Sequence, residues 1–198
     1  MASRRKGRIL AFQALYWWES SVEIAVKGAK APPGVSSKAP PGSPLSAETS
    51  NKMLVEELLN FSWLEADKRG AVNQEIADFS RLLIAGTIEN IGAVDRMIQS
   101  HLQNWHISRL NRVDLAILRM SAYTLMFQRE LPPSIVINEA IGISKEFGAD
   151  ESYRFINGVL DSIRRTLESS EAAPDSAAAE VPRTPGSVVP KEPCPSQS

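Results

Sequence analysis

The chain has very little of several residues on which common protein classes depend. Of its 198 residues one is cysteine, Cys194, and two are histidine, His101 and His106. One cysteine among prolines cannot form a disulfide within the chain, so a reducing compartment is the simpler assumption. The histidines are five residues apart, which does not align two metal ligands on one helix face. The composition therefore predicts neither a disulfide framework nor a metal site.

Motifs of cofactor-dependent enzymes are also missing. Neither a G-x-G-x-x-G nor a G-x-x-x-x-G-K phosphate loop occurs anywhere in the sequence. Adjacent carboxylates, such as Glu56 with Glu57 and Asp150 with Glu151, fall on polar helix surfaces, where charge is usually solvated. We therefore expect no cofactor and no catalytic residues, and the protein is predicted not to be an enzyme.

Long apolar runs are absent too. No stretch approaches the ~20 apolar residues that a membrane helix needs. A basic start followed by the uncharged residues 9–18 resembles a secretory leader. However, Glu19, Glu23 and Lys27 separate that run from the A-K-A sequence at residues 29–31, which resembles a cleavage site. This departure from the leader pattern favours a cytoplasmic protein.

Charge is nearly balanced over the whole chain, with a formal net charge of -1. Such a balance argues against coating nucleic acid by bulk electrostatics, so any such contact must come from a local cluster. One cluster is present, because Arg4, Arg5, Lys6 and Arg8 precede an amphipathic segment. It is either a solvated tail or a phosphate-binding surface. The adjacent Tyr16, Trp17 and Trp18 cannot all face one core, so an aromatic there is available for stacking or for a partner.

Two segments have a composition too poor in large apolar residues to fold. They are residues 28–50, rich in proline, serine and glycine, and residues 169–198, which contain six prolines. Without them, one all-α domain remains within residues 1–168, with the first segment as a flexible linker inside it and the second as a disordered tail. Helical periodicity predicts about seven helices, over residues 4–25, 53–64, 74–90, 94–104, 109–127, 132–147 and 150–167.

The helix expected over residues 109–127 is apolar almost all round, so it should be the central and most buried one. Its polar residues are informative. Arg112 and Arg119 are seven apart and share a face, whereas Asp114 lies on the opposite side.

Phe155 stands out in the last helix, for which Asp150 is the expected N-cap. At about 100° per residue, Ile156, Val159, Leu160, Ile163 and Leu167 form one narrow apolar stripe, and Phe155 lies about 100° from its centre, beside Glu151 and Gly158. Either another part of the fold covers this ring, or a partner does, for example an unpaired base stacking on it.

Several motifs together resemble the NusB family of bacterial transcription antitermination factors. The arginine-rich start runs into A-F-Q-A-L-Y at residues 11–16, R-V-D-L-A-I-L-R follows at 112–119, I-N-E-A stands at 137–140, and F-G at 147–148 precedes F-I-N-G-V-L-D at 155–161. The match covers most of residues 1–167. The final F-x-N-G-V-L-D run is its most specific part.

The resemblance implies a fold of two packed three-helix bundles and a function. That function is binding single-stranded boxA RNA of ribosomal-RNA leader transcripts, with the small-subunit ribosomal protein NusE, in an antitermination complex on RNA polymerase. By position, it implies that Asp114 lies near the protein partner. It also implies that RNA is contacted by the basic start and the last hairpin, through Arg4, Arg5, Lys6, Arg8, Tyr16, Phe147, Glu151 and Phe155.

The sequence departs from the family at a few positions. Gly7 interrupts the basic run and is expected to weaken the start of the first helix, and Gly142 is a poor helix former inside the sixth. Two alternatives remain. One is a homodimer that masks the RNA site. The other is an isolated domain related to the N-terminal domain of ribosomal-RNA cytosine methyltransferases, which the lack of a catalytic α/β domain disfavours.

Overall fold

The structure is a computed structural model that describes residues 2–27 and 44–172. Within these ranges the chain is helical and contains no β-strand, which confirms the expected all-α class. A single-turn 3-10 helix, η1, occupies Ile107–Arg109. The eight α-helices are α1 (Ala2–Lys27), α2 (Pro44–Leu59), α3 (Ala66–Gly70), α4 (Gln74–Glu89), α5 (Ile91–Ser100), α6 (Arg112–Phe127), α7 (Pro133–Phe147) and α8 (Ser152–Ala172).

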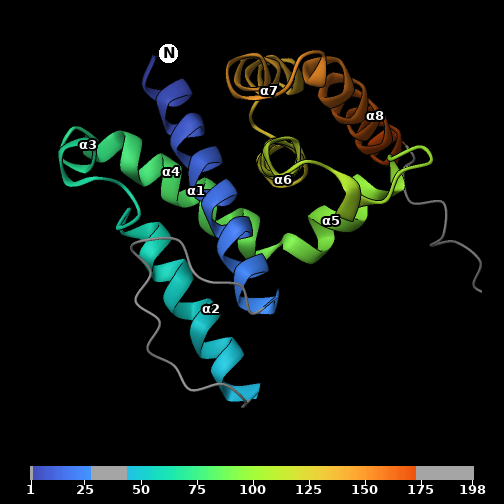
Figure 1. The fold of residues 1–198 in the computed structure, drawn as a ribbon. Helices are drawn as coiled ribbons and strands as arrows, with labels where there is room; N and C mark the ends of the chain where they lie inside the picture. Colours follow the sequence, from blue (N-terminus) through green and yellow to red (C-terminus); the bar gives the residue numbers. More distant parts are fainter. Residues whose placement is uncertain (1, 28–43, 173–198) are drawn as a thin grey trace, which may run out of the picture.

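Helix α6 is the centre of the fold, as its all-round apolar sequence predicted. Figure 1 shows it almost end-on, with α1 and α4 on one side and α7 and α8 on the other. It packs against α1, α4, α5, α7 and α8. Helices α1, α2 and α4 thus form one bundle, and α6, α7 and α8 form the second.

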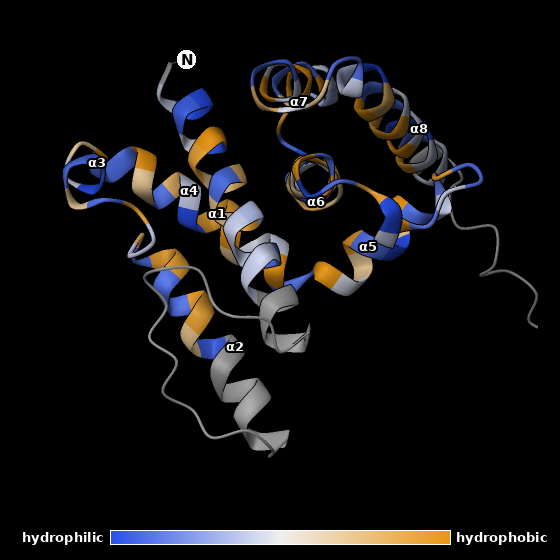
Figure 2. Ribbon diagram, in the orientation of Figure 1, coloured by the Kyte–Doolittle hydropathy of each residue, from blue (hydrophilic) through white to orange (hydrophobic). Residues whose placement is uncertain are grey.

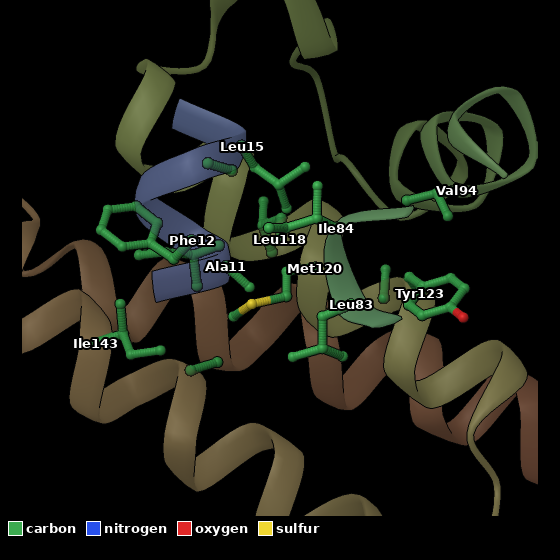
Figure 3. Packing of buried hydrophobic residues seen from close by; sticks show 14 of the residues in the cluster. Ala11, Phe12, Leu15, Leu83, Ile84, Val94, Leu118, Met120, Tyr123 and Ile143 are labelled. Carbon is green, nitrogen blue, oxygen red and sulfur yellow. The ribbon is translucent and has the colours of Figure 1, made fainter. Parts of the chain in front are cut away.

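The core lies where these two bundles meet. Figure 3 shows side chains of α1, α4 and α6 interdigitating, with Ile143 of α7 beside Phe12. In α8 the predicted apolar stripe is confirmed, because Ile156, Val159, Leu160 and Ile163 are buried. Figure 2 shows the same helix with hydrophobic residues on one side and hydrophilic residues on the other.

Arg119 connects α6 to two neighbouring helices. Its Nε and Nη2 each donate a 2.8 Å hydrogen bond to Asp95 of α5, and its Nη1 contacts Glu19 of α1. Arg112, seven residues earlier, donates from Nη1 to Ser20 Oγ at 3.3 Å. The two arginines therefore share the face that their spacing predicted, and that face lies along α1.

Two helices extend into the ends of the segments that composition assigns to the linker and the tail. Residues 44–50, assigned to the linker, form the first turns of α2, because Pro44 suits a first helical position and no proline or glycine follows before Leu59. Helix α8 likewise continues to Ala172, beyond the expected start of the tail at residue 169. Residues 28–43 and 173–198 lie outside the described part of the chain.

Helix boundaries differ from the predictions where single residues leave helical geometry. Phe61 has a φ of 54°, which separates α2 from the short α3, an element that periodicity missed. Helices α5 and α6 are shorter than expected. Asn104 has a φ of 61° in their connection, and Asn111 caps α6 by accepting a 2.8 Å hydrogen bond from the Asp114 backbone N–H.

Gly7 does not weaken the start of α1, contrary to expectation. The helix begins at Ala2 and passes through Gly7 unbroken. A Cβ at this position would lie 2.6 Å from Phe79 Cδ1 of α4, and Ser80 Oγ donates to the Gly7 carbonyl oxygen at 3.0 Å. The missing side chain therefore lets α1 and α4 approach closely.

Candidate nucleic-acid interface

The four basic residues at the start of α1 have different surroundings. Arg4 is exposed, with its guanidinium carbon 4.6 Å from the centre of the Phe79 ring, and Lys6 is exposed. Arg8, four residues after Arg4 on the same helix face, is only 6% exposed and lies 5.4 Å from the same ring. Burial lowers the pKa of Arg8, while the charge of Glu139 acts in the opposite direction. Arg8 is therefore an interior cation, and only Arg4 and Lys6 of these three face solvent.

Arg5 is engaged by α7. Its Nη2 donates to Glu146 at 3.1 Å, and its Nη1 lies 3.7 Å from Glu139. Gly142 stands between these two carboxylates in sequence, and a Cβ there would lie 2.7 Å from Arg5 Nη1. Gly142, which propensity marks as a poor helix residue, thus makes room for the Arg5 side chain.

Tyr16 and Phe147 line one cavity of about 560 Å³. Phe12 connects them, with ring centroids 6.5 Å from Tyr16 and 5.3 Å from Phe147. Tyr16 is 40% exposed, whereas Trp18 is buried, so the adjacent aromatics of α1 do face different surroundings, as expected. The end of α7 therefore lies against the aromatic part of α1.

Glu151 adopts a left-handed backbone conformation at the corner between α7 and α8. Its φ is 67°, its side chain is exposed, and its Oε2 lies 2.7 Å from Arg154 Nε. Because Glu151 is not helical, α8 begins at Ser152, and the expected N-cap, Asp150, lies one residue too early. The Arg154 backbone N–H donates to the Glu151 carbonyl oxygen at 3.0 Å, which closes the first turn.

Phe155 and Asp114 line a second cavity, of about 620 Å³. Phe155 is half-buried and packs partly against the core. Asp114, in the first turn of α6, is buried, and its Oδ2 accepts hydrogen bonds from Asn111 Nδ2 and Ser152 Oγ. Burial raises the pKa of Asp114, while those two hydrogen bonds act to lower it.

Four of the predicted residues therefore line two neighbouring cavities, whereas the basic residues of α1 and Glu151 line neither. Val113 lines the cavity of Tyr16 and Phe147, and the next residue, Asp114, lines the cavity of Phe155. The first turn of α6 thus has one cavity on each side. Asp114, predicted on the protein-partner side, shares a cavity with the predicted RNA residue Phe155.

The second cavity also has an exposed aromatic residue and two cations that were not predicted from the sequence. Arg109 and Arg154 line it, and so does Trp105, whose side chain is 58% exposed. The available signal was a tryptophan in the polar segment between two helices, where no apolar stripe requires it. The contribution of the arginines depends on how η1 and α8 pack together, which helical periodicity does not report.

Neither histidine is arranged for metal binding in the described residues. His101 Nε2 lies 2.8 Å from Thr166 Oγ1, and His106 Nδ1 lies 2.7 Å from Ser108 Oγ. No three histidine, cysteine, aspartate or glutamate residues gather as a metal site in the part of the chain that the structure describes. Over the same residues, no helix is long and apolar enough to cross a membrane.

Comparison with known proteins finds that the chain matches one protein family. Residues 44–165 match the NusB family. The transcription antitermination protein NusB of Treponema denticola is 44% identical over 161 residues, covering 81% of this chain and 95% of that protein. Its counterpart in Treponema pallidum strain Nichols is 39% identical over 163 residues, covering 82% of this chain and 93% of that protein.

Solved structures agree on the fold. The T. maritima NusB structure has a TM-score of 0.57 and 26% identity, and covers 85% of this chain and 96% of that one. A structure of antitermination factors NusB and NusE in complex with dsRNA has a TM-score of 0.57 at 21% identity, and covers 84% of this chain and 98% of that one.

Proposed function

The chain belongs to the NusB family, and from this premise we propose that it binds boxA-type single-stranded RNA in ribosomal-RNA leader transcripts together with the ribosomal protein NusE. In this proposal the complex acts in the cytoplasm as an antitermination factor on RNA polymerase. The protein itself catalyses no reaction, and its relatives are named as antitermination proteins.

The observations that support RNA binding best are the exposed cations at the start of α1 and the two aromatic rings at the cavities beside the first turn of α6. Arg4 and Lys6 are exposed at the start of α1, and Tyr16 and Phe155 each line an open cavity. Cations contact phosphates, and aromatic rings stack on bases that a single strand leaves unpaired. A fold neighbour solved with NusE and dsRNA is compatible with RNA and NusE as partners.

The methyltransferase alternative has little support from the comparisons. The match to the Treponema denticola protein spans 95% of that relative, which leaves almost none of it for a separate catalytic domain. The homodimer alternative stays a prediction. Sedimentation with and without RNA distinguishes it, because a dimer that masks the site must dissociate when RNA binds.

The experiment is a titration of labelled boxA-like RNA and of a scrambled RNA of equal length, each with and without NusE, at two salt concentrations. We expect tighter binding of the boxA-like RNA and a further gain when NusE is present. Equal affinity for the two RNAs at both salt concentrations would reduce the interaction to nonspecific charge attraction and contradict the proposal.

Phe155→Ala tests the stacking residue in the same assay. Loss of one stacked base corresponds to about 1–3 kcal/mol of binding free energy. Phe127→Ala is the matched control, because Phe127 is an exposed aromatic at the far end of α6. Unchanged RNA affinity of Phe155→Ala together with a large loss of stability would show that Phe155 serves only the core.

A further inference from the structure

Residues 63–68, here called the α3 segment, have no role in the function proposed above. They follow α2 and lead into α3, an element that helical periodicity did not predict. We propose that the α3 segment is a further RNA-binding element, in which Trp63 stacks on an unpaired base and Lys68 contacts a neighbouring phosphate. The inference rests on the proposed RNA-binding function and extends its site to a part of the chain that the family resemblance does not assign.

The α3 segment forms one wall of the cavity in which Tyr16 and Phe147 lie. Trp63, Leu64 and Lys68 line this cavity together with Tyr16 of α1 and Phe147 at the end of α7. Figure 1 shows α3 and α7 on opposite sides of α1. Side chains of α1 therefore lie between a wall from the α3 segment and a wall from α7.

The wall from the α3 segment is held in place by contacts with α4. Phe61, two residues before Trp63, is buried, and the guanidinium carbon of Arg81 lies 5.2 Å from the centre of the Phe61 ring. Arg81 Nε also donates a 2.9 Å hydrogen bond to the Leu59 carbonyl oxygen at the end of α2. A wall whose position is already fixed loses little conformational freedom when a ligand binds, which favours affinity.

The lining of this cavity suits a nucleobase. Five of its lining residues are aromatic, and its volume of about 560 Å³ lies within the range of small-molecule sites. Aromatic rings stack on the bases that a single strand leaves unpaired. Trp63 is half-buried and packs partly against the core while it borders the cavity. It therefore adds a further ring to those of Tyr16 and Phe147.

Lys68 is the one charged residue among those that line the cavity. Its side chain is 64% exposed, and its Nζ lies 2.8 Å from Oε2 of Glu65, three residues earlier. An exposed ion pair of this kind contributes little to stability, so Lys68 can exchange Glu65 for a phosphate. A cation beside an aromatic cavity matches a base and the phosphate next to it.

One face of α1 connects this cavity to the basic start of the chain. Lys6 is exposed, and Gln13, seven residues later on the same helix face, lines the cavity. About 10 Å of helix separates these two residues, so one RNA strand can contact Lys6 and then enter the cavity. An apolar segment of a protein partner is the competing occupant, but it would have no use for the exposed cations Lys6 and Lys68.

Lys68→Gln tests the phosphate contact in titrations of the labelled boxA-like RNA over a range of salt concentrations. Loss of one contact should reduce the slope of log Kd against log salt by about 0.7. Lys52→Gln is the matched control, because Lys52 is exposed on α2 and does not line the cavity. Glu65→Gln should tighten RNA binding, because it removes the competing carboxylate. If the ion pair only stabilised α3, Lys68→Gln and Glu65→Gln would change RNA affinity in the same direction.

Trp63→Leu tests the stacking contact. It should weaken binding of the intact RNA about fivefold or more, whereas Trp63→Phe keeps a ring and should retain most of the affinity. The same titrations use RNAs in which one nucleotide at a time lacks its base. At the nucleotide that occupies the cavity, loss of the base should weaken binding to Trp63→Leu much less than binding to the wild type, because the stacked pair is already broken. Urea denaturation establishes that each variant is folded before its affinity is compared.

The outcomes separate this inference from the function on which it rests. A wild type that binds no RNA contradicts the proposed function and this inference with it. A wild type that prefers the boxA-like RNA, with the same salt slope for Lys68→Gln and Lys52→Gln, supports the proposed function and overturns the inference. So does a Trp63→Leu variant that weakens the intact RNA and every RNA lacking one base by the same factor. Weakened NusE binding of Trp63→Leu with unchanged RNA affinity would assign the cavity to the protein partner and also overturn the inference.

Discussion

Arg5 of α1 lies against Gly142 of α7, so that a Cβ on Gly142 would be 2.7 Å from Arg5 Nη1. Glu146 accepts a hydrogen bond from the same guanidinium, and Oε2 of Glu139, two helical turns earlier, lies 3.7 Å from Arg5 Nη1. A cation that the sequence assigns to RNA is thus held by two carboxylates in the free protein. An RNA phosphate that uses Arg5 must displace Glu146.

Gly142→Ala should release Arg5 from this position. The new Cβ overlaps the end of a flexible side chain, which can move, and alanine favours helix by about 1 kcal/mol over glycine. Stability should therefore hold or rise slightly, while the slope of log Kd against log salt for single-stranded RNA steepens by about 0.7 for one added phosphate contact.

Gly92→Ala on α5 is the matched control for this substitution. Its Cβ would meet Arg96 at an ordinary distance of 3.6 Å, so it should gain helix stability and leave the salt slope unchanged. The same slope for Gly142→Ala and wild type would show that Arg5 does not contact phosphate even when it is displaced.

Gly86→Ala should destabilise the protein in spite of its helix propensity. A Cβ there would lie 2.0 Å from the Tyr123 hydroxyl oxygen, and Tyr123 is buried and stacked on Phe127 at 5.4 Å. Overpacking of this kind costs about 1–3 kcal/mol. Urea denaturation measures the loss, and a variant as stable as Gly92→Ala would show that Tyr123 moves freely out of the way.

Arg119→Ala should be among the most damaging single changes. Burial alone would lower the pKa of Arg119, but its hydrogen bond to Asp95 and the charges of Asp95 and Glu19 raise it overall. Removing the guanidinium leaves two carboxylates close together without their partner, a change that costs about 3 kcal/mol or more.

The control is Arg165→Ala, because Arg165 pairs with Asp161 on the exposed surface of α8 and such pairs contribute at most about 1 kcal/mol. Chemical denaturation of both variants gives the comparison. Similar losses for the two would mean that the cluster joining α1, α5 and α6 is no more stabilising than a surface ion pair.

Asp114 should make stability depend on pH in an unusual direction for a carboxylate. Burial raises its pKa in the folded protein, although hydrogen bonds from Ser152 and Asn111 oppose this, so the folded state binds the proton more tightly than the unfolded chain. The contribution of Asp114 to the free energy of unfolding therefore falls as pH rises from the ordinary aspartate pKa through the raised value.

The measurement is the difference in free energy of unfolding between wild type and Asp114→Asn, taken from about pH 3 to about pH 7. Taking this difference cancels the contributions of the other carboxylates to the pH dependence. One of them is Asp161, whose pKa is lowered by Arg164. His101, Arg109 and Arg154 line the same cavity, and they are present in both proteins. A difference that increases with pH would contradict the raised pKa.

The local sequence pattern was sufficient to predict much of the fold. The helical class, the central position of α6 and the buried stripe of α8 all follow from apolar residues repeating at the helical period, which depends only on neighbours a few positions away. The same pattern placed Phe155 off the stripe, and the structure finds it half-buried at a cavity. Boundaries failed at Phe61, Asn104 and Glu151, because periodicity does not indicate a positive φ.

Whether each charged residue is buried, paired or exposed was decided only by the tertiary structure. Four basic residues in five positions look equivalent in sequence, yet Arg8 is buried beside Phe79, Arg5 is paired with Glu146, and Lys6 is exposed. Asp114 and Phe155 share a cavity although 41 positions separate them in the numbering. Burial and pairing depend on residues brought from distant parts of the chain, and the packing of α1 on α4 and α7, and of α6 on α8, determines them.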